Sequence, residues 1–291
     1  MVVVKRFRSN WGIDPTPDYA NYREWFPKLK MQGYAGVEVN LHTIDNPELL
    51  KSICDENNLE INVLQVHIFS AWPRYRGPRP RLTVQEHLVA YKEQLIRAKA
   101  FNPSKVNAQS GSDVFTYEQS VEFFQGTLTI DAELGLSGRV YHETHRNRSL
   151  FSPYAADFVL KRVPELRITA DFSHWVVGCE RLLDVAEEDI ELLERIYPHV
   201  YHIHSRIGTT QASQCPDPLD PVYEAEVKSF ENIWKAAIRA QVLRDGKDST
   251  ITFVPEWGPY PYHPHYSSRD FSEVADAEGA RHQELFQRIN Q

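Results

Sequence analysis

Short apolar segments alternate along this chain with longer amphipathic segments. The short segments have the length and apolar content of β-strands, and the longer ones repeat their apolar positions with the period of an α-helix. The predicted strands are Val2–Phe7, Ala35–Leu41, Ile61–Ile68, Lys105–Gln109, Arg139–His145, Arg167–Phe172, Val200–His204 and Thr250–Glu256. The predicted helices are Asp18–Gln32, Pro47–Asn57, Val84–Ala100, Glu118–Leu134, Pro153–Arg162, Leu182–Tyr197, Glu224–Leu243 and Phe271–Ile289.

Eight strand–helix units in 291 residues predict an α/β fold, a (β/α)8 TIM barrel that forms one domain over residues 1–291. A doubly wound open sheet is the alternative. No G-x-G-x-x-G motif follows the first strand, which disfavours a dinucleotide-binding sheet. Two long loops rich in turn-forming residues, Ile207–Val222 and Trp257–Arg269, follow the last two strands. They would lie on the face where barrel enzymes hold their active sites.

Polar residues interrupt several predicted strands, although the strands of a barrel are covered on both faces and should be almost entirely apolar. Alternate residues of a strand share a face, so parity sorts these polar residues into groups. The groups are Glu38 with Asn40, Gln65 with His67, Asn107 with Gln109, Glu143 with His145, Thr169 with Asp171, and His202 with His204. If these groups point inward, several carboxylates and imidazoles meet near the carboxyl-terminal rim of the barrel.

Four of these positions predict a metal site. Glu143, Asp171, His204 and Glu256 lie at the ends of four consecutive predicted strands. Each one alone is more often a helix cap, a salt-bridge partner or a hydrogen-bonded core residue. Several carboxylates buried together, however, carry a free-energy cost that a divalent cation removes. Three carboxylates and one imidazole suit Mn²⁺, Mg²⁺, Co²⁺ or Zn²⁺.

Aromatic and basic residues occur at the same rim. Trp11, Trp72, Trp175 and Trp257 fall just after predicted strands, and so do Arg146, Arg148 and Arg206. The tryptophans either pack the barrel mouth or form the apolar wall of a ligand pocket. The arginines, as a group, could hold a carboxylate, a phosphate or a polyol.

The overall charge and the cysteines limit the partners of this chain. Its 32 basic and 40 acidic residues give a net charge of −8, which argues against a protein that binds nucleic acid. No apolar run approaches the ~20 residues of a membrane span, and no signal peptide is visible. The three cysteines form no C-x-x-C motif. We therefore expect a cytoplasmic protein that acts on a small molecule, without a membrane partner.

Four segments hold the candidate ligands and their neighbours: Tyr141–Arg148, Ala170–Trp175, Tyr201–Arg206 and Val254–Trp257. Together they resemble the xylose-isomerase-like TIM-barrel superfamily, and within it the sugar phosphate isomerase/epimerase group with its ketose 3-epimerases. The resemblance implies that Glu143, Asp171, His204 and Glu256 bind the metal and that the two glutamates also move protons at a ketose carbon. It also implies that His174, in the D-x-x-H motif of the sixth strand, touches substrate or metal. His142 and His145 around Glu143, and the Ser-Arg-Ile-Gly that follows His204, depart from the epimerase pattern.

The resemblance implies a divalent-metal-dependent isomerase or epimerase that acts on a sugar or sugar-like hydroxy-ketone through an enediolate. Glu143, Glu256 and His145 are the expected catalytic residues, with His145 as a neutral base. The expected substrate-binding residues are His174, Arg206, Glu38, His67, Gln109, Trp11, Trp72, Trp175 and Trp257. A homo-oligomer is compatible with the resemblance.

Three alternatives remain open at this point. A metal-dependent lyase or deglycosidase that eliminates from a keto-sugar glycoside would need the same acidified C–H bond. An abasic-site endonuclease of the same superfamily is disfavoured by the net negative charge. A non-catalytic binding protein is disfavoured because unneeded buried carboxylates are costly.

Overall fold

The computed structural model describes residues 2–65 and 82–289 of the chain. Eight parallel strands close into a barrel in chain order, with β1 paired to both β2 and β8. The strands are β1 (Val3–Ser9), β2 (Gly36–Asn40), β3 (Glu60–Gln65), β4 (Lys105–Ala108), β5 (Val140–Glu143), β6 (Ile168–Ala170), β7 (Val200–His204) and β8 (Thr250–Val254). The predicted (β/α)8 barrel is confirmed.

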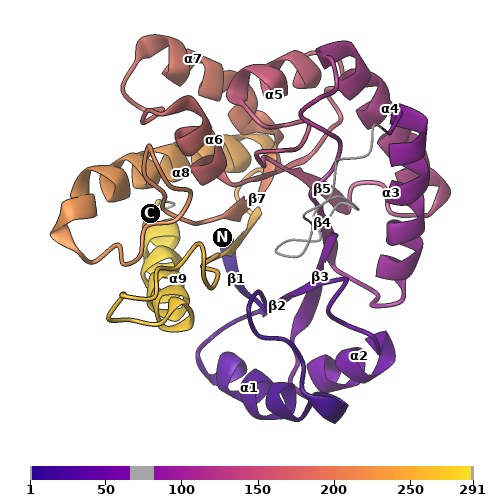
Figure 1. Cartoon of the computed structure of the whole chain (residues 1–291), viewed down its shortest axis with the longest axis vertical. Coiled ribbons are helices and arrows are strands. Elements are labelled where there is room, and N and C mark those ends of the chain that lie inside the picture. Colours follow the sequence, from indigo (N-terminus) through magenta and orange to yellow (C-terminus); the bar gives the residue numbers. More distant parts are fainter. Residues whose placement is uncertain (1, 66–81, 290–291) are drawn as a thin grey trace.

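A ring of helices surrounds the barrel (Figure 1). In the described part of the chain these are α1 (Ala20–Met31), α2 (Pro47–Glu56), α3 (Val84–Lys99), α4 (Tyr117–Glu133), α5 (Pro153–Leu160), α6 (Phe172–Cys179), α7 (Glu187–Ile196), α8 (Glu224–Asp245) and α9 (Phe271–Arg288). Three short 3₁₀ helices accompany them: η1 (Pro17–Tyr19), η2 (Tyr197–His199) and η3 (Pro221–Tyr223).

Local sequence signals explain where several helices begin. The side chain of Asn46 accepts a hydrogen bond from the backbone N–H of Leu49, and Pro47 follows at the first helical position of α2. Reciprocal capping boxes start α3 at Thr83, α4 at Thr116 and α9 at Asp270.

The carboxyl-terminal half differs from the sequence-based prediction in two places that matter for the site. Strand β5 ends at Glu143, so His145 lies beyond the strand. Strand β6 is only three residues long, and the sequence analysis missed the helix α6 that follows it. Asp171 caps α6, because its Oδ1 accepts hydrogen bonds from the backbone N–H and the hydroxyl of Ser173 at 2.9 and 2.6 Å.

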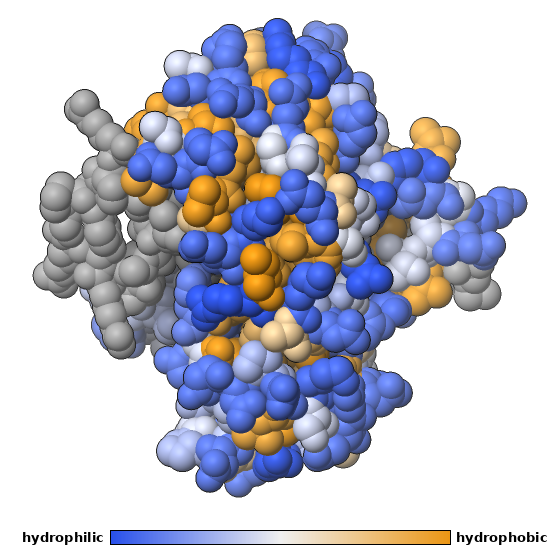
Figure 2. Space-filling view, turned by 90° about the vertical axis from the view of Figure 1, so that its right-hand side faces the viewer, coloured by the Kyte–Doolittle hydropathy of each residue, from blue (hydrophilic) through white to orange (hydrophobic). Residues whose placement is uncertain are grey.

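Apolar packing lies mainly between the strands and the helices. One buried cluster joins β2, β3 and β4 to α1, α2 and α3, and a second joins the later strands to α4–α9. The outer face that carries α3 and α4 is mostly hydrophilic, with hydrophobic residues in small patches (Figure 2). No helix in the described ranges is both long and apolar enough to cross a membrane. Polar side chains from different strands contact one another inside the barrel, where Lys105 and His202 both contact Thr252 and the ring of Phe7 lies beside them.

Candidate functional site

The four predicted metal ligands converge at the carboxyl-terminal mouth of the barrel. Glu143 is the last residue of β5, Asp171 follows β6, His204 ends β7, and Glu256 lies two residues beyond β8. One ligand atom from each side chain lies within 4.8 Å of the others, and all four residues are buried. The structure therefore contains a cluster of three carboxylates and one imidazole that could hold a metal ion.

Arg206 contacts two of the four side chains of this cluster. Its Nη2 contacts Asp171 Oδ2, and its Nη1 lies 3.2 Å from Glu256 Oε2. The same Nη2 lies 2.8 Å from His174 Nε2. The side chain of Arg206 is 2% exposed, and its positive charge offsets those of two buried carboxylates. Arg206, which was predicted to bind substrate, lines the cavity at the barrel mouth and also pairs with two of the candidate metal ligands.

The protonation of the two glutamates differs sharply. Burial raises the pKa of Glu143 to about 8, with a further contribution from the charge of Glu256. Burial also acts on Glu256, but the positive charges of Arg206 and His204 outweigh it and lower its pKa well below the ordinary range. Without a cation, the pKa values of the two glutamates are thus shifted in opposite directions, and Glu143 releases its proton at a higher pH than Glu256 does. Two carboxyl groups separated in this way are suited to the roles of acid and base.

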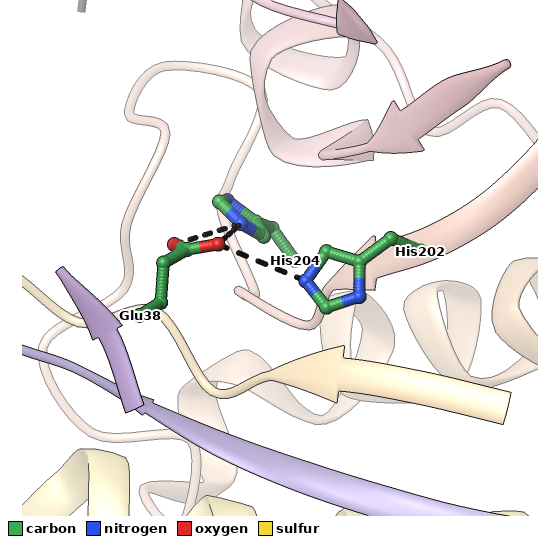
Figure 3. A group of neighbouring side chains, drawn as sticks. All are labelled: Glu38, His202 and His204. Atoms are coloured by element: carbon green, nitrogen blue, oxygen red, sulfur yellow. Dashed lines mark hydrogen bonds and ion pairs between the residues drawn. The ribbon is translucent and has the colours of Figure 1, made fainter. Parts of the chain in front are cut away.

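Glu38 of β2 lies on the far side of the His204 ring. Its carboxylate faces His204 Nε2 at 3.2 Å and His202 Nε2 at 3.8 Å, and both imidazoles point toward it in Figure 3. All three side chains are buried. Burial tends to lower the pKa of His204, but the charges of Glu38, Glu256 and Glu143 outweigh it and raise this pKa well above its ordinary value, so without a cation the imidazole is protonated. A cation bound at Nδ1, which faces Glu256 at 3.4 Å, would take the place of one of these protons. Glu38, which was predicted to bind substrate, lies in contact with His204 in this structure.

The residues around Glu143 hold it in place. Asn107 Nδ2 donates to Glu143 Oε2 at 2.8 Å, and Gln109 Nε2 lies 3.2 Å from the same oxygen. Gln109 also lines the cavity at the barrel mouth. Strand parity thus brought the polar residues of β4 and β5 to one interior face, as expected. His142 takes the opposite face and contacts Tyr91 of α3 and Phe124 of α4.

His145 reaches the mouth from the turn that follows β5. Its ring lies 3.8 Å from that of His174, and both are close enough to Glu143 to form a second possible ligand group. Its Nδ1 lies 2.5 Å from the backbone carbonyl of Arg146, so Nδ1 carries the proton and Nε2 has the free lone pair. Burial, together with the charges of neighbouring arginines, lowers the pKa of His145 well below its ordinary value. His145 is therefore neutral at pH 7.

A cavity of about 590 Å³ opens above the cluster. Its wall includes Glu256, Arg206, His145, Gln109 and Trp11. This volume lies within the usual range of small-molecule sites.

The four predicted tryptophans do not share one environment. Trp11 lines the cavity. Trp175 and Trp257 are fully buried and donate their indole N–H to the backbone carbonyls of Leu150 and Cys215. Their rings serve packing rather than the cavity wall. Trp72 lies outside the described residues, and so does His67.

Sequence reasoning left Tyr262 and Asn10 out of the site. Both line the cavity, and the ring of Tyr262 contacts Trp11 at 4.8 Å. The only available signal for Tyr262 was its position in the turn-rich loop after the eighth strand. Asn10 directly follows β1, a position where the sequence analysis singled out no candidate.

The donor set fits a hard or borderline divalent cation. His204 Nδ1 and Glu256 Oε2 are buried, and neither makes a hydrogen bond of normal geometry within the part of the chain that the structure describes. Both atoms face the same point between the strand ends. Carboxylate oxygens with one imidazole nitrogen are ligands typical of Mn²⁺, Mg²⁺ or Zn²⁺.

No protein-family description matches this chain, and no curated protein matches it either. Several solved structures do. The D-psicose 3-epimerase of Clostridium cellulolyticum H10, solved with D-tagatose, has a TM-score of 0.60 at 14% identity over 99% of each chain. A sugar phosphate isomerase/epimerase from Parabacteroides distasonis has a TM-score of 0.57 at 13% identity, over 97% of this chain and 93% of that one.

An AP endonuclease of family 2 from Brucella melitensis is also similar, with a TM-score of 0.55 at 17% identity over 95% of this chain and 98% of the other. These proteins carry names of different activities, so the likeness concerns the fold and not the reaction. Together with the barrel topology, these matches confirm the (β/α)8 barrel fold over nearly the whole chain.

Proposed function

We propose that this protein is a divalent-metal-dependent isomerase or epimerase of a sugar or sugar-like hydroxy-ketone. The observation that carries the proposal is the convergence of Glu143, Asp171, His204 and Glu256 beneath a cavity of about 590 Å³. The similar solved structures include several sugar epimerases and sugar phosphate isomerases, which supports the same reaction class.

The four ligand side chains would hold the cation. When bound, it would stabilise negative charge on the oxygens of a hydroxy-ketone and so acidify the neighbouring C–H bond. Mn²⁺ is among the ions that this donor set suits, together with Mg²⁺, Co²⁺ and Zn²⁺.

The protein residues would move the proton. The Glu256 carboxylate takes a proton from the carbon beside the ketone, which leaves an enediolate. The carboxyl group of Glu143, on the other side of the substrate, then gives a proton to the opposite face of the same carbon. The configuration at that carbon is thereby inverted. His145, neutral and with its Nε2 lone pair available, is the alternative base for the first step.

The contacts of Glu256 support its role as the base. Arg206 keeps its carboxylate ionised, and Glu256 lines the cavity although only 4% of it is exposed. Glu143 is hydrogen-bonded by Asn107 and Gln109, and a ligand atom of Glu143 lies within 4.8 Å of one of Glu256. In the proposed reaction, the substrate bound to the cation would lie between these two carboxyl groups.

Two measurements test the proposal. Elemental analysis of the purified protein and of the Asp171→Asn variant should show about one equivalent of a divalent ion in the first and much less in the second. The loaded enzyme should then be incubated with a panel of ketoses in D₂O. Incorporation of deuterium at a carbon next to the ketone, with no other change in product mass, is the expected result.

The other activities give different products. A lyase would release a leaving group, so the product would be lighter than the substrate. Cleavage of DNA that contains an abasic site, with no exchange into any ketose, would contradict the proposal and favour the endonuclease alternative. Metal-free protein that shows full activity would also contradict it.

A further inference from the structure

Three buried polar side chains form a hydrogen-bonded chain between the end of β7 and helix α9. Ser205 directly follows His204, and its hydroxyl oxygen lies 2.9 Å from His282 Nδ1 on α9. One turn earlier on the same helix, Glu278 Oε2 faces His282 Nε2 at 3.1 Å. Each of the three residues is at most 1% exposed. The chain therefore connects α9 to the residue that separates His204 from Arg206.

The charges of this chain determine where its hydrogens lie. Burial acts to raise the pKa of Glu278, but hydrogen bonds from His282 and Arg281 outweigh it and lower this pKa to about 2. Burial lowers the pKa of His282, so its imidazole is neutral at pH 7 and keeps one N–H. That N–H, on Nε2, suits the ionised Glu278, and the lone pair on Nδ1 accepts the hydroxyl hydrogen of Ser205. The direction of the Ser205 side chain is thereby fixed.

The imidazole of His282 lies among aromatic rings. Between ring centres it is 4.7 Å from Trp234 and 5.9 Å from Phe286, and both Phe253 and Trp257 lie at 6.5 Å. An apolar side chain would suit these surroundings without the free-energy cost of burying a polar group. Packing alone therefore does not account for a histidine at this position.

Ser205 lies where the pairing of β7 with β8 ends. The register between these strands ends at the pair of His204 and Val254. The N–H of Ser205 donates to the carbonyl oxygen of Val254 at 2.8 Å, and the Ser205 hydroxyl lies 3.3 Å from the same oxygen. Side chains of an extended segment alternate between two faces. A Ser205 that is held against α9 thus directs its two neighbours, His204 and Arg206, toward the barrel interior.

Strand β5 carries a comparable hydroxyl directly after a candidate ligand. Thr144 follows Glu143, and its Oγ1 accepts the backbone N–H of Asp171 at 2.8 Å and donates to the carbonyl of the same residue at 2.9 Å. Strand β6 ends one residue earlier, at Ala170. At two of the four candidate ligands, a hydroxyl in the next position therefore holds the backbone at a strand end.

We propose that His282 is a positioning residue, which holds Ser205 against α9. Through Ser205, it keeps the side chains of His204 and Arg206 directed at the candidate metal centre. Glu278 in turn fixes the imidazole of His282. This inference rests on the proposed function, because it concerns the geometry of the same metal centre. It adds to that centre a group from the helix layer that contacts neither the cation nor the substrate.

Calorimetric titration with Mn²⁺, after a chelator has removed bound metal, tests the proposal. His282→Phe introduces a ring of similar size that suits its aromatic neighbours, and it leaves Glu278 paired with Arg281. Ser205→Ala removes only the hydroxyl. We expect each variant to bind Mn²⁺ about tenfold more weakly than wild type, since outer partners of metal ligands have effects of this size.

A third variant separates positioning from a general loss of stability. His282→Asn leaves a cavity but keeps an amide that can hydrogen-bond to Ser205. It should therefore be less stable than His282→Phe in denaturant unfolding and yet bind Mn²⁺ more tightly. If His282 had only a structural role, Mn²⁺ affinity would follow the free energy of unfolding across the variants.

A double variant and a control complete the test. If His282 acts through Ser205, His282→Phe should cause no further loss of Mn²⁺ affinity in the Ser205→Ala background. His87→Phe on α3 is the matched control, because His87 is also a buried imidazole against aromatic rings, those of Phe115 and Phe123. This control should bind Mn²⁺ as wild type does.

Wild-type Mn²⁺ affinity in both His282→Phe and Ser205→Ala would overturn the inference. So would losses that add up in the double variant, or affinities that follow stability. In those cases, metal-dependent C–H exchange in ketoses would leave the proposed function standing. Conversely, the expected pattern of Mn²⁺ affinities without any exchange by wild type would support the positioning role and contradict the proposed reaction. A wild-type protein that binds no divalent ion would contradict both.

Discussion

The carboxylate of Glu38 faces His204 Nε2 at 3.2 Å, on the opposite side of the imidazole ring from Glu256. A histidine that binds a metal through one nitrogen is commonly held by a carboxylate at the other, which fixes its tautomer and raises its basicity. Glu38 therefore has the position of an orienting residue for a candidate metal ligand.

This relationship predicts that Glu38→Gln weakens metal binding about 10- to 100-fold while the fold is retained. The amide keeps the volume of the side chain and can still accept a hydrogen bond, but it lacks the negative charge that raises the basicity of the imidazole. Titration with Mn²⁺, followed by calorimetry, measures the effect, and excess metal should restore activity. Glu60→Gln, in the neighbouring strand, is the control, because Glu60 pairs with Lys5 away from the site. Unchanged Mn²⁺ affinity in Glu38→Gln would exclude the orienting role.

A second prediction concerns the proton-moving group. Glu256→Gln should reduce turnover by a factor of about 100 or more, because the amide cannot accept the substrate proton. The loss should persist at saturating metal, and circular dichroism should show an intact fold. Glu133→Gln on α4, where Glu133 pairs with Lys92 at the surface, is a suitable control. Full activity in Glu256→Gln would rule out Glu256 as the base.

His145 is either a base or a residue that orients Glu143, and kinetics separate these roles. If it is a base, His145→Ala lowers turnover by a factor of about 100 with the metal still bound. If it only orients a ligand, the variant mainly loses metal affinity, and added metal restores the rate. His199→Ala is the control for the loss of an imidazole, because His199 directly precedes the first residue of β7 and thus lies at the end of the strand away from His204. Complete rescue by metal would eliminate the role of base.

Asp131 in α4 predicts a pH-dependent stability that is independent of the candidate metal centre. Burial raises its pKa to about 7, from an ordinary value of 3.8, and Tyr91 donates to its Oδ1 at 2.7 Å. The folded state therefore binds the proton more tightly than the unfolded state does. The contribution of Asp131 to the free energy of unfolding is therefore fully present below pH 3.8 and is lost as the pH rises toward 7.

Replacement of Asp131 by asparagine removes the group that titrates. The amide keeps an oxygen that can accept the hydrogen bond from the Tyr91 hydroxyl. The free energy of unfolding of Asp131→Asn, relative to wild type, should increase by on the order of 2 kcal/mol between pH 5 and pH 8. Denaturant unfolding at the two pH values measures it. Asp55→Asn on the surface of α2 is the control. A difference that does not vary with pH would show that Asp131 does not titrate in this way.

The barrel could be predicted because its pattern is local and repeated. Strand and helix periodicities, with caps such as Asn46, identified the eight units. Parity then placed Glu143 inside the barrel and His142 in the helix layer, since side chains on a strand alternate between two faces. The convergence of the four ligands followed from the fold, because parallel strands end at one rim.

Other features depended on contacts between distant segments. Trp175 and Trp257 follow strands as Trp11 does, yet only the packing of the helices and loops around them decides which ring is buried. Helix α6 begins because Asp171 caps it, so one carboxylate serves both as a cap and as a candidate ligand.

The sequence by itself determined the fold, the inward face of each strand and the residue types at the mouth, because these depend on periodicity and on strand ends. Only the tertiary structure decided how the charges pair. Arg206 turns into the carboxylates, Glu38 reaches His204 from the other side of the barrel, and Arg146 has a phenol for a partner. Pairing depends on distances between side chains from different strands, and no local pattern encodes those distances.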